Sequence, residues 1–196
     1  MKLVFTQGNP GSKFDSTRHN VGFAIADAFA QQAGASFKPT SKFFAEIAEG
    51  NVGGEKIIIA KPTTFYNETG QSFNAIKQFY KLENEDILVV HDELAIPFGT
   101  LRGRIGGTDA GNNGIKSINS HGGDTTARLR IGVGNEQRAV MGDTDFVLGK
   151  FSKDEHEALT KTLIPKCLEI ITEFITDSHS VTSHKLIDWP IANFKV

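Results

Sequence analysis

The chain has 196 residues and a net charge of −2, a size typical of one α/β domain with a sizeable core and a charge that argues against general coating of nucleic acid. Its single cysteine, Cys167, excludes an internal disulfide and any site that needs several cysteines. No cationic and apolar leader opens the chain, and no apolar run approaches the roughly 20 residues of a membrane span, so we expect a soluble cytoplasmic protein that does not enter the membrane.

Strand-like and helical patterns alternate along the chain. The expected strands are 2–6, 43–49, 55–60, 86–91, 100–105 and 126–133. Apolar residues at helical spacing predict helices over 18–33, 68–81 and 153–176, and Pro165 should kink or divide the last one. Asn51-Val-Gly-Gly54 predicts a hairpin that makes the second and third strands antiparallel. The alternation favours an α/β fold with a mixed sheet.

Charge is distributed unevenly along the chain. Residues 98–130 contain five basic residues and two acidic ones, whereas residues 143–177 contain eight acidic residues and four basic ones. The first stretch could bind a polyanion and the second would repel one. An ordinary solvent-exposed face with no ligand gives the same pattern.

Two motifs stand close together near the start of the chain. Gln7-Gly-Asn-Pro-Gly11 stops the first strand, so Asn9 leaves the strand end, and Thr17-Arg-His-Asn20 places His19 at a helix start. Turn formation and helix capping account for either motif alone. The pairing of an amide with an imidazole at one strand end favours an enzyme.

Polar side chains also follow other strand runs. Ligands of open α/β sheets bind beyond the carboxyl ends of the strands, so Asn9, Asn67 and Asp92 are expected in one crevice. A carboxylate there can hold one imidazole nitrogen and leave the other free to accept a proton, which makes His19 the candidate base and Asp92 its orienting residue. Asparagines at 9, 67 and 113 suit such a cleft because each amide both donates and accepts hydrogen bonds.

Several other chemistries are excluded by spacing. The sequence has no dinucleotide fingerprint, phosphate loop, nucleophile elbow or His-Glu-x-x-His helix. His91, Asp92, Glu93 and His121 lack the spacing of metal ligands, so no metal site is expected.

The ordered motifs resemble those of bacterial peptidyl-tRNA hydrolase over about residues 2–151. They are Gly8-Asn-Pro-Gly11, Thr17-Arg-His-Asn20 with Gly22-Phe23, Lys61-Pro-Thr-Thr-Phe65 with Asn67 and Gly70, Asp92, Gly99, Asn113-Gly114 with Ser117-Ile118, Arg128-Leu-Arg-Ile-Gly-Val-Gly134 and Val147-Leu-Gly-Lys-Phe151. The resemblance implies a single three-layer α/β/α domain over residues 1–196 with a mixed, mostly parallel sheet. We treat residues 178–196 as a candidate C-terminal tail.

The resemblance also implies an activity: hydrolysis of the ester between a peptide's C-terminus and the 3′ ribose of tRNA, in translation and ribosome rescue. No cofactor and no stable protein partner are implied, and the protein is expected to be a monomer that binds peptidyl-tRNA. His19 would activate water and Asp92 would orient His19. The peptide would be bound by Asn9, Tyr66, Asn67 and Asn113, and the tRNA by Arg102, Arg104 and Arg130.

This chain departs from the family pattern around the expected site. Tyr66 stands where the family commonly has methionine, and Asn112 replaces the histidine usual before Asn113. His91 replaces the first member of an Asp-Asp pair and, because strand side chains alternate, should face away from Asp92. Thr6 and Gln7 replace a glycine and a leucine.

Three functions remain open on the sequence alone. The leading hypothesis is an active peptidyl-tRNA hydrolase in which His19 assists the attack of water without a metal. The second is a tRNA or ribonucleoprotein binding protein on the same fold that has lost turnover, and the third is a metal hydrolase. Release of peptide with and without a chelator distinguishes the three.

Overall fold

One mixed sheet organises the residues that the computed structural model describes, which are 1–176 and 181–187. Within those residues eight strands lie in the order β2-β3-β4-β1-β5-β7-β6-β8. Their bounds are β1 (Lys2–Thr6), β2 (Lys38–Thr40), β3 (Ala45–Val52), β4 (Glu55–Pro62), β5 (Ile87–Pro97), β6 (Thr100–Ile105), β7 (Ala127–Gly134) and β8 (His184–Lys185).

The strand directions confirm the mixed sheet but correct its expected character. β1 is parallel to β4 and β5, and β5 is parallel to β7. The other four pairings, which extend the sheet to both edges, are antiparallel. The expectation of a mostly parallel sheet was therefore wrong, because β2, β3 and β4 form a meander and β6 turns back along β7. The parallel strands are the central ones, and their carboxyl ends point the same way.

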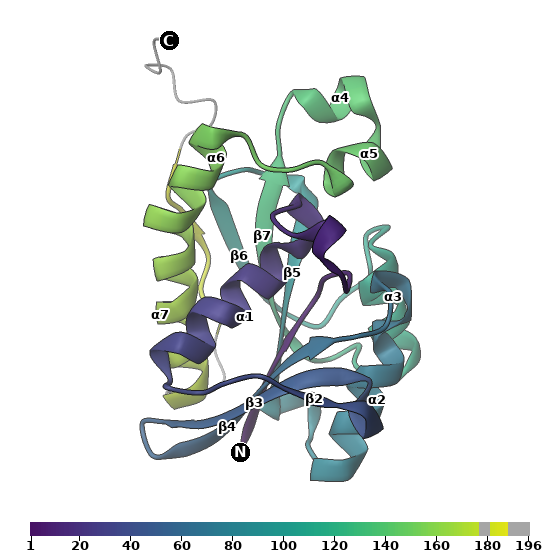
Figure 1. Ribbon diagram of the computed structural model, residues 1–196, viewed down its shortest axis with the longest axis vertical. Helices are drawn as coiled ribbons and strands as arrows, with labels where there is room; N and C mark the ends of the chain where they lie inside the picture. The colour runs from purple at the N-terminus through teal and green to yellow at the C-terminus, as the bar shows by residue number, and fades with distance from the viewer. Residues whose placement is uncertain (177–180, 188–196) are drawn as a thin grey trace.

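Helices cover both faces of this sheet and complete a single-domain, three-layer α/β/α fold (Figure 1). One face carries α1 (Val21–Gln32) and α7 (Ile164–Thr176), and the other carries α2 (Thr69–Tyr80) and α3 (Asn113–Ser120). The shorter helices α4 (Gln137–Met141), α5 (Asp143–Leu148) and α6 (Lys153–Ala158) follow β7.

The central strands bury both of their faces, as their nearly continuous apolar sequences require. In β1, Val4 packs with the α1 and α7 side, while its neighbours Leu3 and Phe5 pack with the α2 and α3 side. Phe5 meets Phe73 of α2 edge to face, with ring centroids 5.5 Å apart. The alternation of side chains thus gives one core on each side of the sheet.

The expected elements form at or near their predicted positions. The hairpin at Asn51–Gly54 joins β3 to β4 antiparallel, and Gly53 and Gly54 both adopt positive φ there. The expected strand 86–91 runs on to Pro97, because β5 keeps pairing with β7 through an irregular register between Glu93 and Pro97. Asp92 therefore lies inside β5 rather than just after its end.

The long helix expected over 153–176 is divided, as predicted. A π-helical turn over Leu159–Leu163 separates α6 from α7, and Pro165 lies in the first turn of α7, where its missing N–H is tolerated.

Part of the candidate tail 178–196 lies in the described chain. His184 and Lys185 pair with Leu101 and Thr100 as β8, whereas residues 178–180 and 188–196 lie outside the described residues. Among the helices that can be described, none combines the length and apolar character needed to span a bilayer.

Candidate active site

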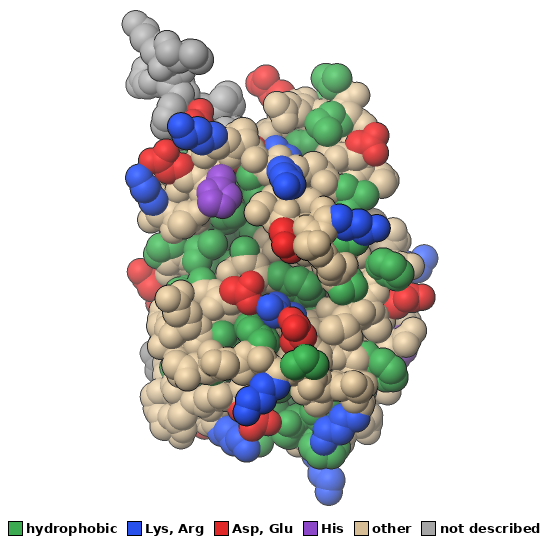
Figure 2. Space-filling view, in the orientation of Figure 1, with side chains coloured by type: hydrophobic (Ala, Val, Ile, Leu, Met, Phe, Trp, Pro, Cys, Tyr) green, Lys and Arg blue, Asp and Glu red, His purple; other side chains and the backbone are tan. Residues whose placement is uncertain are grey.

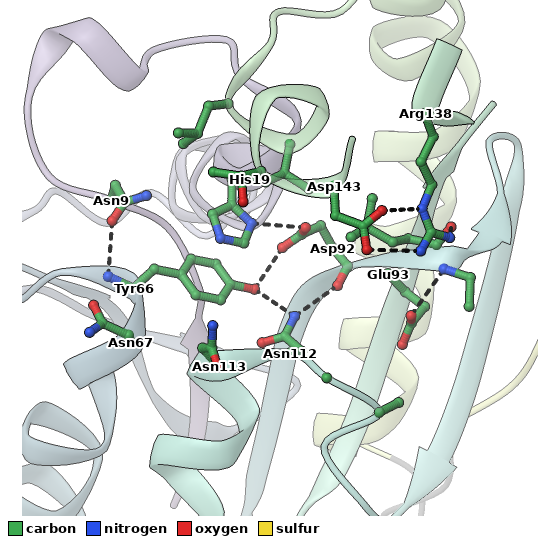
Figure 3. Close-up of a pocket in the computed structure, with 17 residues that line it drawn as sticks. Asn9, His19, Tyr66, Asn67, Asp92, Glu93, Asn112, Asn113, Arg138 and Asp143 are labelled. Atoms are coloured by element: carbon green, nitrogen blue, oxygen red, sulfur yellow. Dashed lines mark hydrogen bonds and ion pairs between the residues drawn. The ribbon is translucent and has the colours of Figure 1, made fainter. Parts of the chain in front are cut away.

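A pocket of about 390 Å³ opens beside the central parallel strands. Its lining includes every residue that the sequence assigned to catalysis or peptide binding, and Figure 3 shows how they converge. These residues are Asn9, His19, Tyr66, Asn67, Asp92 and Asn113. Residues far apart in the chain therefore meet near the carboxyl ends of the central parallel strands, where the sequence predicted a crevice.

His19 and Asp92 form a hydrogen-bonded pair in this pocket. His19 Nδ1 lies 2.9 Å from Asp92 Oδ2, and the side chains are 18% and 2% exposed. Because an ionised carboxylate only accepts, the imidazole proton resides on Nδ1 and Nε2 is left as the basic nitrogen. The arrangement is that of a base and its orienting carboxylate.

The backbone around His19 is fixed by the two motifs that the sequence singled out. Arg18–Asn20 form a 3₁₀ turn that leads into α1. The Asn20 side chain accepts from the Asn9 N–H at 2.9 Å and donates to the Asn9 carbonyl at 2.9 Å, which joins the turn after β1 to the helix start. At Gly22 a Cβ would collide with the Gln7 carbonyl oxygen, so this glycine allows α1 to begin against the end of β1.

Asn9 is buried and its amide is oriented by a backbone group. Its Oδ1 accepts from the Tyr66 N–H at 2.9 Å, so the amide NH₂ remains as the group that can donate into the pocket (Figure 3). Asn67 and Asn113 lie at the pocket rim with exposed side chains, near the starts of α2 and α3. The three asparagines thus offer amide groups at different depths.

Tyr66 is buried and lines the pocket beside His19. Its ring stacks on the His19 ring with centroids 3.6 Å apart and an interplanar angle of 12°, and its hydroxyl donates to Asp92 Oδ1 at 2.6 Å. Burial, followed by the nearby Asp92 carboxylate, raises the pKa of Tyr66 well above its usual value, so the phenol stays protonated. Any side chain at Gly114 would run into the Tyr66 ring, so that glycine lets α3 approach it.

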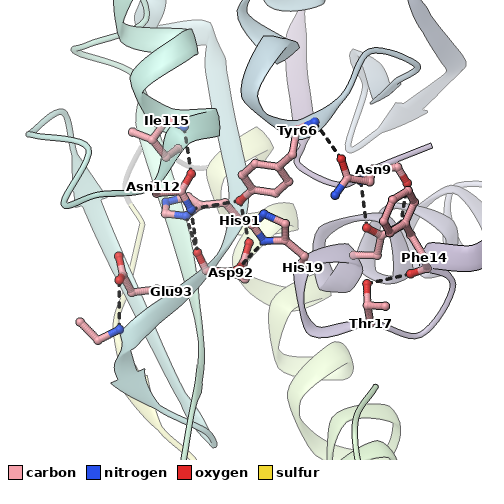
Figure 4. Close-up of polar contacts among 12 residues, drawn as sticks. Asn9, Phe14, Thr17, His19, Tyr66, His91, Asp92, Glu93, Asn112 and Ile115 are labelled. Atoms are coloured by element: carbon pink, nitrogen blue, oxygen red, sulfur yellow. Dashed lines mark hydrogen bonds and ion pairs between the residues drawn. The ribbon is translucent and has the colours of Figure 1, made fainter. Parts of the chain in front are cut away.

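Asn112 is a site residue that the sequence analysis did not assign. It caps α3 by accepting from the Ile115 N–H at 3.0 Å, and its amide donates to the Tyr66 hydroxyl at 3.1 Å and to the Asp92 carbonyl at 3.3 Å (Figure 4). Its position before Asn113 was the only signal in the sequence, and that signal indicated a changed residue rather than a contact.

The outer wall of the pocket was also missed. This wall comes from the segment after β7. There Arg138 of α4 makes a bidentate ion pair with Asp143 and donates to the Leu94 carbonyl at 3.0 Å. Val147 and Leu148 of α5 face the same pocket. The motif Val147-Leu-Gly-Lys-Phe151 marks Val147 and Leu148 but gives them no role, and no motif marks Arg138 or Asp143, because these residues reach the site only through the path of the chain after β7.

His91 lies on the other face of β5, as strand alternation predicts. It is the cross-strand neighbour of Arg130, and its Nδ1–H donates to the Asp92 backbone carbonyl at 2.8 Å rather than to the carboxylate. Burial lowers the pKa of His91, so this imidazole is neutral and does not enter the His19–Asp92 pair.

Four arginines share one face of β6 and β7. The strand register places Arg102 opposite Arg130 and Arg104 opposite Arg128, and all four are outside the pocket. Arg130 is paired with Glu93 at 2.9 Å, while Arg102 and Arg104 are exposed and make no ion pair with any described carboxylate. Burial, with Arg104 and Arg130 beside it, lowers the pKa of Arg128.

The arginine face contrasts with the side that carries α1 and α7. There, acidic and basic side chains alternate over the surface without a large area of one sign (Figure 2).

Within the described ranges, no group of three or more histidine, cysteine or acidic side chains is arranged to hold a metal ion.

Together, the three-layer fold and a histidine–carboxylate pair in a cleft beside the parallel strands define the class of protein, an α/β enzyme. The family model described as peptidyl-tRNA hydrolase matches residues 3–188. The chain therefore belongs to the peptidyl-tRNA hydrolase family, an enzyme family of translation that hydrolyses peptidyl-tRNA.

Individual relatives agree with this assignment. The chain is 46% identical to a peptidyl-tRNA hydrolase of Anaeromyxobacter sp. strain K over 160 residues, which cover 81% of this chain and 82% of the relative. It is 38% identical to one from Clostridium botulinum over 182 residues, or 91% and 94% of the two chains. A crystal structure of the Acinetobacter baumannii peptidyl-tRNA hydrolase superposes with a TM-score of 0.80 at 34% identity, covering 90% of this chain and 88% of that one.

Proposed function

We propose that this protein cleaves the ester between a peptide's C-terminus and the 3′ ribose of tRNA by a water attack that His19 assists without a metal. The observation that carries the proposal is the 2.9 Å contact between His19 Nδ1 and Asp92 Oδ2 inside a pocket lined by four asparagines. The enzyme acts as a monomer in the cytoplasm.

The chemistry follows from the basic nitrogen that faces the pocket. His19 Nε2 removes a proton from a water molecule as the water oxygen bonds to the ester carbonyl carbon. Asp92 stabilises the imidazolium that forms. When the carbon–oxygen bond to the ribose breaks, His19 returns the proton to the 3′ oxygen, which releases tRNA with a free hydroxyl and a peptide with a carboxylic acid that loses its proton to solvent.

The asparagines bind the substrate around this centre. The Asn9 amide NH₂, held by the bond from Tyr66 N–H to its oxygen, donates to the oxyanion that develops on the carbonyl. Asn67 and Asn113, exposed at the rim, bind the peptide backbone, whose groups both donate and accept.

The function is tested by release of labelled peptide from peptidyl-tRNA, with and without a chelator. We expect release by the purified protein at an unchanged rate in the chelator, because no step needs a metal ion. Binding of peptidyl-tRNA without release would contradict hydrolysis, and release that the chelator abolishes would contradict the metal-free mechanism.

Asp92→Asn tests the orienting role. An asparagine amide directed at Nδ1 favours the tautomer with the proton on Nε2, so turnover should fall by about 10²-fold, while binding of tRNA stays within a factor of two. Steady-state release and filter binding measure the two effects. Asp27→Asn, on an exposed side chain paired with Lys61, is the matched control and should leave both unchanged. Equal loss of turnover and of binding in Asp92→Asn would contradict an orienting role.

The arginine face of β6 and β7 is proposed as the tRNA contact. Arg102 and Arg104 are exposed, so a double change to glutamine should weaken tRNA binding and reduce the slope of log affinity against log salt by about one per arginine. Arg130 should contribute less, because it is paired with Glu93. Lys161→Gln, within the acidic stretch 143–177, is the control. An unchanged salt slope in the double variant would place the tRNA elsewhere.

A further inference from the structure

Asp92 serves two partners with its two carboxylate oxygens. Oδ2 accepts from His19 at 2.9 Å and Oδ1 accepts from the Tyr66 hydroxyl at 2.6 Å, while the side chain is only 2% exposed. A buried carboxylate must have its oxygens satisfied by donors, because water does not reach them. The Tyr66 hydroxyl therefore takes the place that water would otherwise occupy on Asp92.

Tyr66 contacts the other member of the pair as well. Its ring lies against the His19 ring at a centroid distance of 3.6 Å and an angle of 12°. Stacking fixes the plane of the imidazole, and the hydroxyl fixes the carboxylate that the imidazole meets. One side chain thus restrains both the direction of Nε2 and the position of its partner.

Asn112 sets the direction of the phenolic proton. Its Oδ1 is already used by the Ile115 N–H at 3.0 Å, so the amide can only present N–H to the Tyr66 oxygen, 3.1 Å away. The Tyr66 oxygen therefore accepts from Asn112 and gives its own proton to Asp92 (Figure 4). These two residues, 46 positions apart, form one chain of hydrogen bonds that ends on Asp92.

Resting on the proposed function, we propose that Tyr66 is a positioning residue for the His19–Asp92 pair and that Asn112 orients its hydroxyl. This differs from the expectation that Tyr66 binds the peptide. A peptide contact affects KM first, whereas a residue that holds the base and its carboxylate affects kcat.

Tyr66→Phe tests the hydroxyl while it keeps the stacked ring. We expect kcat to fall about tenfold with KM within twofold of the wild type, the loss that follows from one hydrogen bond to a buried charge. Tyr80→Phe is the matched control, because the only other tyrosine bonds Glu49 at 2.9 Å outside the pocket, and its kcat should not change. An unchanged kcat in Tyr66→Phe, or a rise in KM alone, would overturn the proposal.

A double-mutant cycle tests Asn112. Asn112→Ser keeps a side-chain oxygen to cap α3 but removes the amide donor, and should lower kcat about threefold in the wild type. In the Tyr66→Phe background the same change should have a smaller effect, because no hydroxyl remains to orient. If the two substitutions lowered kcat by fully additive free energies, Asn112 would not act through the Tyr66 hydroxyl.

A readout without substrate separates this proposal from the proposed function. In protein labelled with ¹⁵N-histidine, the His19 Nδ1–H signal should move in Tyr66→Phe and should move further in Tyr66→Met, which also removes the ring above the imidazole. Neither change is expected in Tyr80→Phe. Absence of peptide release by the wild type would refute hydrolysis but would leave this signal as a test of the positioning role. A His19 signal that does not move in either Tyr66 variant would overturn the positioning role.

Discussion

Replacing His19 with alanine should lower the turnover of peptidyl-tRNA by about 10²–10⁴-fold, the usual contribution of a general base. Its Nδ1 is occupied by Asp92, so Nε2 is the one ring nitrogen that can accept a proton from water in the pocket. The arginine face on β6 and β7 is separate from this pocket, so binding of tRNA should persist. Single-turnover release of labelled peptide and filter binding measure the two quantities.

A second histidine supplies the control for this experiment. His156→Ala changes an exposed side chain on α6, outside the pocket that holds His19, and should leave release unchanged. Circular dichroism and thermal unfolding of His19→Ala establish that the variant is folded, which matters because Tyr66 loses its stacking partner. Full release by a folded His19→Ala variant would end the proposed mechanism.

The pair His19–Asp92 was predictable because both residues depend on the central strands. The carboxyl ends of parallel strands meet at one edge, so Asn9 after β1, Asn67 after β4 and Asp92 on β5 had to lie near one another. The meeting of these residues depends only on β1, β4 and β5 being adjacent and parallel. It was therefore predicted correctly although β5 is longer than expected and more of the strand pairings are antiparallel.

The rest of the site depends on side-chain contacts that no periodicity encodes. Tyr66 follows β4 and Asn112 precedes α3, and the bond between them forms because Gly114, in the first turn of α3, lets the helix approach the Tyr66 ring. The sequence marked both positions as departures from the family pattern but could not show that they touch. The wall from α4 and α5 was missed for a related reason, since loop paths between elements follow from packing.

A buried ion pair joins the His19 turn to the helices after β7. Arg18 Nη2 lies 2.7 Å from Glu155 Oε2, and the two side chains are 3% and 1% exposed. Arg18 also donates to the Lys150 carbonyl at 2.6 Å and stacks over the Phe146 ring at 4.4 Å, while Glu155 accepts from Asn135 at 2.7 Å. Because Arg18 immediately precedes His19, this cluster anchors the backbone of the base to the segment that walls the pocket.

Breaking the pair from either side should destabilise the protein strongly. Glu155→Gln keeps the shape of the side chain but leaves the Arg18 charge buried without its partner, and we expect a loss of about 3–5 kcal/mol in the free energy of unfolding. Arg18→Met leaves the Glu155 charge unpaired and should cost a similar amount. Urea unfolding at neutral pH measures both.

Removing both charges together should cost much less than the sum of the two single changes. In Arg18→Met with Glu155→Gln neither side chain is charged, so the double-mutant cycle should report strong coupling between the two positions. Lys161→Ala, which breaks the exposed pair between Lys161 and Glu157, is the control and should leave the urea midpoint nearly unchanged. Single losses as small as that of Lys161→Ala would mean that water reaches Arg18, and the anchor for His19 would then have to come from the Asn9–Asn20 bonds alone.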